Sequence, residues 1–169
     1  MDILIDKPAR VRGYALHRIV EQFLQGRPAL WADEGHQVRI RPEEATPPVY
    51  EAGRLLAFTT VACVSFSAGH KHRYLPLTDW RGRRGWLDKQ GERHGFALVG
   101  VHVTPGMQEV QTHDGRRFTI DATEFTGLLK VTDPQAFANC LVKGIGRVGS
   151  AFGRVTYTDK PPVTDNAKV

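Results

Sequence analysis

The sequence has 169 residues, room for one ordinary domain or two small ones, and 41% of them are hydrophobic, as in a soluble globular protein. No apolar run approaches the roughly 18 residues that span a bilayer, and the first residues lack the order of a signal peptide, so we expect a cytoplasmic protein. The two cysteines are far apart and suggest neither a disulfide framework nor a zinc site. The net charge of +5 favours a polyanionic partner.

Residues 1–48 predict a small first domain. A short strand is expected over residues 2–6, and a helix over 13–26, where apolar residues recur at helical spacing until Gly26 ends the pattern. The segment HQVRIR alternates like a half-buried strand. The proline-rich stretch PEEATPP then predicts a linker.

Residues 49–160 predict a second domain, followed by a flexible tail at 161–169. Strands are expected in RLLAFTTVACVSF, GFALVGVHVT and AFGRVTY, and a hairpin in MQEVQTHDGRRFTIDATEFTGLLKVT, because Asp114–Gly115 is a strong two-residue turn signal. A glycine-interrupted helix is expected around residues 80–94. A second helix runs from an Asp133 cap and Pro134 to Gly144. This is the β-α-β-β-α-β order of a ferredoxin-like domain, of which residues 1–48 give only the opening part.

The segment LVKGIGRVGSAFGRV contains the pattern G-x-G-x-x-G in Gly144, Gly146 and Gly149. A dinucleotide-binding loop must follow a strand and open a helix, whereas this loop follows a helix and leads into a strand. It also lacks the Gly-Lys-Ser/Thr ending of a Walker A loop. A helix cap followed by a turn is the simpler interpretation, but it leaves the basic residues of the loop unexplained.

The stretch FTGLLKVTDPQAFANCLVKGIGRVGSAFG resembles the C-terminal end of the CRISPR-associated repeat-RNA (pre-crRNA) endoribonucleases, most closely the processing nuclease of subtype I-E (Cascade) systems. In that family a strand, a D-P-x-x-F helix and a G-I-G-R…A-F-G loop close the second of two ferredoxin-like domains. The resemblance extends more weakly over RLLAFTTVACVSF, WLDKQGERHGFALV and YALHR. Family members are usually longer. The resemblance therefore implies an α+β fold of tandem ferredoxin-like (RRM-like) domains, the first one reduced.

The resemblance also implies a chemistry. The family cleaves CRISPR repeat hairpins in precursor RNA without a metal: the 2′-OH beside the scissile bond attacks the phosphate, which leaves a 2′,3′-cyclic phosphate and a 5′-OH. By the family's Y-x-x-H motif, Tyr14 and His17 are the catalytic pair, with His17 as general acid or base and Tyr14 positioning the phosphate. No metal or cofactor is expected. The implied partners are repeat stem-loop RNA, both precursor and mature crRNA, and protein subunits of an effector complex, with no membrane.

The helical pattern is compatible with these two roles. On a helical wheel His17 lies about 90° from the centre of the apolar face, with Tyr14 further round on the same side and one turn away. His17 also lies in the first turn, where the helix dipole disfavours the imidazolium form. The alternative is that both are boundary residues at the start of a helix.

Basic clusters supply the candidate RNA contacts. Duplex RNA presents phosphates and 2′-hydroxyls, and the arginine fork matches phosphate geometry. A solvated turn and a solvated helix face are the alternatives for the arginines in DGRRF and WRGRRGW. The predicted RNA-binding residues are Arg18, Arg81, Arg83, Arg84, Arg116, Arg117, Lys143, Gly144, Gly146, Arg147, Gly149 and Ser150.

The chain departs from the family pattern in two places. Ser150 stands where the family usually has lysine, and Glu21 and Gln22 stand where some members carry a basic residue. The segment GHKHR offers two histidines, His70 and His72, without a neighbouring carboxylate or cysteine, so a basic loop is favoured over a metal site.

Three functions compete. The leading one is the endoribonuclease that stays bound to its product in an effector complex. The second is a non-cleaving RNA-hairpin-binding subunit of the same fold, and the third is an unrelated basic ferredoxin-like protein. The presence of both Tyr14 and His17 favours cleavage over binding alone.

Overall fold

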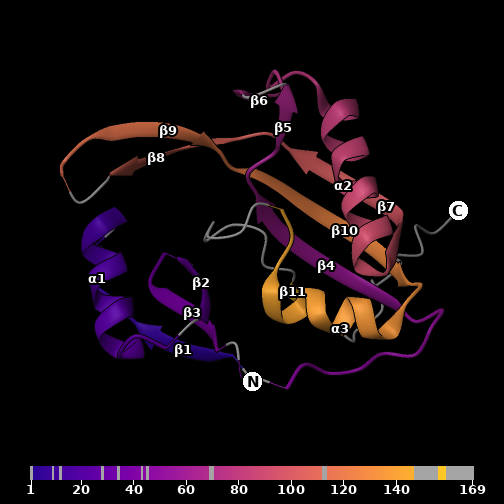
Figure 1. Ribbon diagram of the computed structural model, residues 1–169, viewed down its shortest axis with the longest axis horizontal. Helices are drawn as coiled ribbons and strands as arrows, with labels where there is room; N and C mark the ends of the chain where they lie inside the picture. The colour runs from indigo at the N-terminus through magenta and orange to yellow at the C-terminus, as the bar shows by residue number, and fades with distance from the viewer. Residues whose placement is uncertain are drawn as a thin grey trace, which may run out of the picture.

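A computed structural model shows two α+β units, each built on an antiparallel sheet (Figure 1). It describes residues 2–8, 10–11, 13–27, 29–33, 35–42, 44, 46–68, 71–111, 114–146 and 156–158. Within these ranges, no helix is long and apolar enough to cross a membrane.

The first unit is a three-stranded sheet with one helix against it. Its elements are β1 (Ile3–Asp6), α1 (Gly13–Leu24), β2 (Ala29–Asp33) and β3 (Gln37–Pro42). The apolar face of α1, with Leu16 and Val20, packs on Val38 and Ile40 of β3. The sheet order β1-β3-β2 is that of the first three strands of a ferredoxin-like domain, and the described residues of this unit form no second helix and no fourth strand. The first unit is therefore reduced, as predicted, although β2 was not expected.

The second unit is a complete ferredoxin-like domain with two added hairpins. Its four-stranded sheet has the order β11-β4-β10-β7, every neighbouring pair antiparallel, and Figure 1 shows α2 and α3 on one side of it. The core between sheet and helices is built around Phe58, Phe125 and Phe137. The elements are β4 (Leu55–Ala62), β5 (Ser65–Ala68), β6 (Lys71–Tyr74), α2 (Trp80–His94), β7 (Phe96–Thr104), β8 (Met107–Gln111), β9 (Arg117–Asp121), β10 (Thr123–Val131), α3 (Pro134–Lys143) and β11 (Thr156–Thr158).

The order of elements in this unit is the predicted one, and the fold is α+β with tandem ferredoxin-like units. Two details differ from the prediction. The expected strand RLLAFTTVACVSF ends at Ala62 and resumes as β5, which pairs with β6 in the segment expected to be a basic loop. The long hairpin expected after residue 107 is a shorter one, β8–β9, followed by β10 as a strand of the main sheet.

Among the described residues, contacts between the two units include the following two. Arg41 of β3 forms an ion pair with Asp2 at 2.6 Å and donates to the carbonyl oxygen of Leu141 on α3. On the other side, the β8–β9 hairpin leaves the second unit and reaches α1, which lies beside β8 (Figure 1). The linker was expected at residues 42–48; Pro42 is the last residue of β3, and residues 46–48 are in neither helix nor strand. The boundary at residue 48 stays a prediction, and the tail at 161–169 lies outside the described residues.

Candidate functional site

His17 projects from the side of α1 that is not buried in the core. Its neighbour Leu16 is 1% exposed, whereas the His17 side chain is 44% exposed. The imidazole Nε2 lies 3.1 Å from Oε1 of Glu21, one helical turn further on. The ring also stacks against Trp31 of β2, with 6.1 Å between centroids and 29° between planes. The imidazole is thus held by two neighbours while part of it stays open to solvent.

Glu21 and Trp31 were not among the predicted site residues. Glu21 lies at position i+4 from His17, a spacing that brings side chains together on a helix, so the sequence did contain that signal. Trp31 comes from β2, a strand that was not expected, and no local pattern connects it with His17. Tyr14 lies on α1 one turn before His17, but its side chain is outside the described part of the chain, and Arg18 is exposed. The catalytic roles of Tyr14 and His17 stay predictions.

The β8–β9 hairpin carries two exposed arginines at its tip. Gly115 has φ +81°, a left-handed conformation that favours glycine, as the predicted Asp114–Gly115 turn requires. Arg116 lies 3.1 Å from the carboxylate of Asp114, and Arg117 lies 3.4 Å from that of Glu109. Exposed ion pairs of this kind contribute only about 0–1 kcal/mol, so RNA phosphates can compete for both guanidinium groups. The structure brings this basic hairpin next to the helix that carries His17.

The glycine segment begins at the C-terminus of α3. Asp133 caps the start of that helix by accepting from two backbone N–H groups, and Gly144 ends it with φ +76° and an N–H bond of 2.8 Å to the carbonyl of Cys140. Lys143 is exposed in the last turn. The loop therefore follows a helix, as the sequence predicted, and not a strand as a dinucleotide loop would.

Gly146 also needs the conformation that only glycine adopts easily. Its φ is +89°, and a Cβ atom added there would lie 3.4 Å from Cζ2 of Trp86. Ile145, between the two glycines, is buried in the core of the second unit and anchors the start of the loop. The remaining predicted loop residues, Arg147, Gly149 and Ser150, lie outside the described residues.

The three arginines of α2, predicted as one group, have different environments. Arg81 is exposed and lies over the ring of Trp80, 5.2 Å from its centroid. Arg84 is half-exposed and lies 4.0 Å from the carboxylate of Asp88. Both can be reached by a polyanion.

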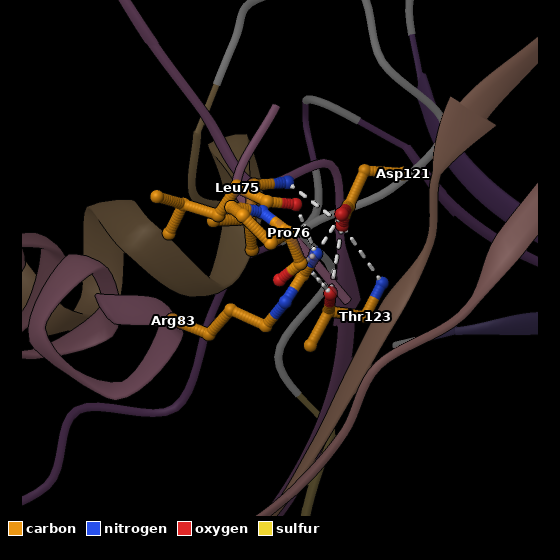
Figure 2. Close-up of polar contacts among 6 residues, drawn as sticks. Leu75, Pro76, Arg83, Asp121 and Thr123 are labelled. Carbon is orange, nitrogen blue, oxygen red and sulfur yellow. Dashed lines mark hydrogen bonds and ion pairs between the residues drawn. The ribbon is translucent and has the colours of Figure 1, made fainter. Parts of the chain in front are cut away.

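Arg83 is not available to RNA, so the prediction is wrong for this residue. Its side chain is fully buried and forms an ion pair with Asp121, which is buried too (Figure 2). Leu87 and Gln90, four and seven positions later, are also buried, so Arg83 lies on the inward face of α2. This spacing was visible in the sequence, but the partner that makes a buried arginine acceptable lies 38 positions away.

Within the described residues, no group of three or more His, Cys, Asp or Glu side chains is placed to hold a metal ion. His70 lies outside the described part of the chain, and so does the side chain of His72. The interpretation of GHKHR as a basic loop rather than a metal site therefore stays a prediction, although residues 71–74 form β6.

The fold and the site together define a class. The chain has two ferredoxin-like units, an exposed histidine on the helix of the first, and a basic hairpin from the second beside that helix. It is an α+β protein of the tandem ferredoxin-like class. The profile of the family described as CRISPR associated protein matches residues 14–154, and the chain belongs to that family.

Several solved structures share this fold. The CRISPR endoribonuclease Cse3 bound to 19 nt RNA is 21% identical, with 93% of this chain and 98% of that chain covered at a TM-score of 0.71. Thermus thermophilus Cse3, bound to an RNA representing a pre-cleavage complex, is 20% identical, with 93% and 97% covered at 0.69. Cas6e from Escherichia coli is 18% identical, with 91% and 96% covered at 0.69. None of the curated proteins matches the chain.

Proposed function

We propose that the chain is a metal-independent endoribonuclease that cleaves CRISPR repeat hairpins in precursor RNA and stays bound to the mature crRNA in an effector complex. The observation that carries the proposal is the match of 93% of the chain to Cse3 solved with RNA. The family match over residues 14–154 supports the same assignment. The helix that carries His17 lies beside the basic β8–β9 hairpin, which gives the proposal a chemical site.

The reaction needs two proton transfers and no metal. The 2′-oxygen attacks the adjacent phosphorus and loses its proton, the bond from phosphorus to the 5′-oxygen breaks, and that oxygen gains a proton. The products are a 2′,3′-cyclic phosphate and a 5′-OH. His17 serves one of these transfers as general base or general acid, and Tyr14 positions the phosphate.

The environment of His17 suits such a role. Its Nε2 faces the exposed carboxylate of Glu21, and an exposed pair at this spacing contributes only about 0.3–0.5 kcal/mol. An RNA hydroxyl can therefore take the place of the carboxylate at little cost in free energy. The stacking with Trp31 keeps the ring oriented during the exchange.

Basic and glycine residues would hold the RNA hairpin so that its scissile bond lies at His17. Arg116 and Arg117 project from the hairpin beside α1 and would contact the phosphates of the stem. Arg81 and Arg84 would follow the stem backbone along α2. The other proposed RNA contacts are Arg18, Lys143, Gly144, Gly146, Arg147, Gly149 and Ser150, which would bind the phosphates near the cleaved bond.

The test is cleavage of a hairpin transcribed from the CRISPR repeat of the same genome, in the presence of EDTA. We expect two fragments, with a 2′,3′-cyclic phosphate on one and a 5′-OH on the other. An unstructured RNA of the same composition is the control and should stay intact. A requirement for a divalent metal, or a 3′-OH end, would contradict the proposed mechanism.

A second candidate is a subunit of the same fold that binds the hairpin without cutting it. One observation favours it: the carboxylate of Glu21, 3.1 Å from Nε2 of His17, adds negative charge where some family members carry a basic residue. Tight binding of the hairpin by wild-type protein, with no fragments after long incubation, would decide for this candidate.

A further inference from the structure

The interior of the second unit contains a polar network centred on Arg83 and Asp121, both fully buried (Figure 2). Nη1 of Arg83 donates to a carboxylate oxygen of Asp121 and to the hydroxyl of Thr123. Nη2 donates to the carbonyl oxygens of Leu75, at 2.8 Å, and Pro76, at 3.3 Å. One guanidinium group therefore joins α2, the segment before it, and the junction of β9 with β10.

The carboxylate of Asp121 makes a second set of bonds. Its Oδ1 accepts from the backbone N–H of Val64 and of Thr123, both at 3.2 Å, and from the Thr123 hydroxyl at 2.7 Å. Val64 lies in the short gap between β4 and β5. Asp121 therefore joins the end of β9 to the start of β10 and to the end of the neighbouring strand.

This network lies at the root of the basic hairpin. Asp121 is the last residue of β9 and pairs with Met107, the first residue of β8. At the other end of the hairpin, which carries Arg116 and Arg117, residues 114–119 are all exposed. Its apolar side chains are poorly covered, since Phe118 is 48% exposed. The direction in which the hairpin leaves the sheet is therefore determined at its root more than along its length.

We propose that Arg83 and Asp121 are positioning residues that fix the direction of the β8–β9 hairpin, and through it the placement of Arg116 and Arg117 relative to His17 on α1. Hydrogen bonds between charged groups are directional, and the planar guanidinium fork holds several acceptors in one arrangement. A buried ion pair is weak evidence for stability but restricts the geometries that its partners can adopt. The effect of the network on RNA binding rests on the proposed function, whereas its effect on the direction of the β8–β9 hairpin does not.

The first experiment needs no RNA. In the double variant Arg83→Met/Asp121→Asn, no buried charge is left unpaired, and the asparagine oxygen can still accept from Val64 and Thr123. Amide hydrogen exchange of the full chain should become at least about tenfold faster in β8 and β9, while β4 and β10 keep their protection. Unchanged exchange in the hairpin of the folded variant would overturn the proposal.

A matched control separates positioning from general loss of stability. Leu87→Ala removes a fully buried side chain from the same face of α2, one turn after Arg83, and none of the network bonds involves it. It should not speed exchange selectively in the hairpin, and an equal selective effect would contradict a specific role for the ion pair. If the double variant fails to fold, Arg83→Lys replaces it: lysine keeps the charge but loses the fork, and hairpin exchange should still increase selectively.

The second experiment asks whether the network acts through the hairpin arginines. The Arg83→Met/Asp121→Asn pair is introduced into wild-type protein and into protein that already carries Arg116→Ala/Arg117→Ala. The affinity of each of the four proteins for the RNA repeat hairpin is then measured. We expect a loss of roughly tenfold in the first case and almost none in the second, the non-additivity of coupled positions. Additive losses would overturn the proposal. If wild-type protein does not bind the RNA hairpin, the proposed function fails. Hydrogen exchange still decides whether Arg83 and Asp121 position the β8–β9 hairpin.

Discussion

Removing the two arginines at the tip of the β8–β9 hairpin should weaken RNA binding without affecting the fold. The side chains of Arg116 and Arg117 are 85% and 65% exposed, and they pair with the exposed or half-exposed carboxylates of Asp114 and Glu109 respectively. Such pairs contribute about 0–1 kcal/mol to stability. Arg116→Ala/Arg117→Ala should therefore unfold within a few degrees of wild type.

The magnitude of the effect on binding follows from the number of phosphates released. Each neutralised phosphate contributes about 0.7–0.9 to the slope of log affinity against log salt concentration, so two arginines account for up to about 2 units. Between about 50 and 200 mM salt, the variant should consequently lose about tenfold less affinity than wild type does. At low salt, where phosphate contacts are strongest, the variant should show its largest deficit.

The assay is a fluorescence anisotropy titration of a labelled repeat hairpin at several salt concentrations. A charge-matched control is Arg54→Ala/Lys130→Ala, which removes two exposed positive charges from the second unit away from the hairpin. The control should keep most of the wild-type slope. An unchanged slope and affinity in Arg116→Ala/Arg117→Ala would remove the hairpin from the RNA surface and refute the reasoning.

Three further predictions concern other residues. Gly146→Val should fold but lose binding of the RNA hairpin, because valine is strained at φ +89° and would shift the loop backbone away from this conformation; normal binding by the folded variant would make the loop a simple connector. Tyr14→Phe should slow cleavage less than removal of the histidine does, since only a hydroxyl is lost; an equal or larger single-turnover defect would contradict a secondary role. Burial raises the pKa of the Cys140 thiol to about 12, so in Cys63→Ser protein at pH 8 a thiol reagent should label it only after unfolding. Between pH about 8.5 and that value, the Cys140 thiol is ionised in the unfolded chain but still protonated in the folded one. The free energy of unfolding should therefore fall more steeply with pH in this protein than in the Cys140→Ala variant. Rapid labelling of the folded protein would contradict both expectations.

Capping and turn residues in the sequence predicted where the neighbouring helix and hairpin begin or end. Asp133 and Pro134 mark the start of α3 and Gly144 its end, and all three occupy the predicted positions. The Asp114–Gly115 turn lies at the tip of a hairpin, as expected, but Gln111 pairs with Arg117, so five residues separate the strands where the signal predicted two. Once helices and strands alternate in this order, the ferredoxin-like arrangement of the sheet follows from chain connectivity.

Features that depend on distant partners could not be predicted in the same way. Arg83 belongs to a run of arginines that resembles a solvated helix face, and only the fold brings Asp121 to it. Trp31 reaches His17 from a strand whose segment, ALWAD, is short and lacks clear alternation. These contacts arise from tertiary packing, which overrides local pattern.

The central claim, that His17 transfers a proton in cleavage of the repeat hairpin, is tested most directly by a single-turnover measurement on His17→Ala in EDTA. General acid–base catalysis contributes roughly 10²–10⁴-fold, so the cleavage rate should fall by that factor while affinity for the hairpin stays close to wild type. Gln22→Ala, an exposed change on the same helix, is the control and should cleave at the wild-type rate. Cleavage by His17→Ala at the wild-type rate, or wild-type cleavage that stops when EDTA is added, would contradict the account.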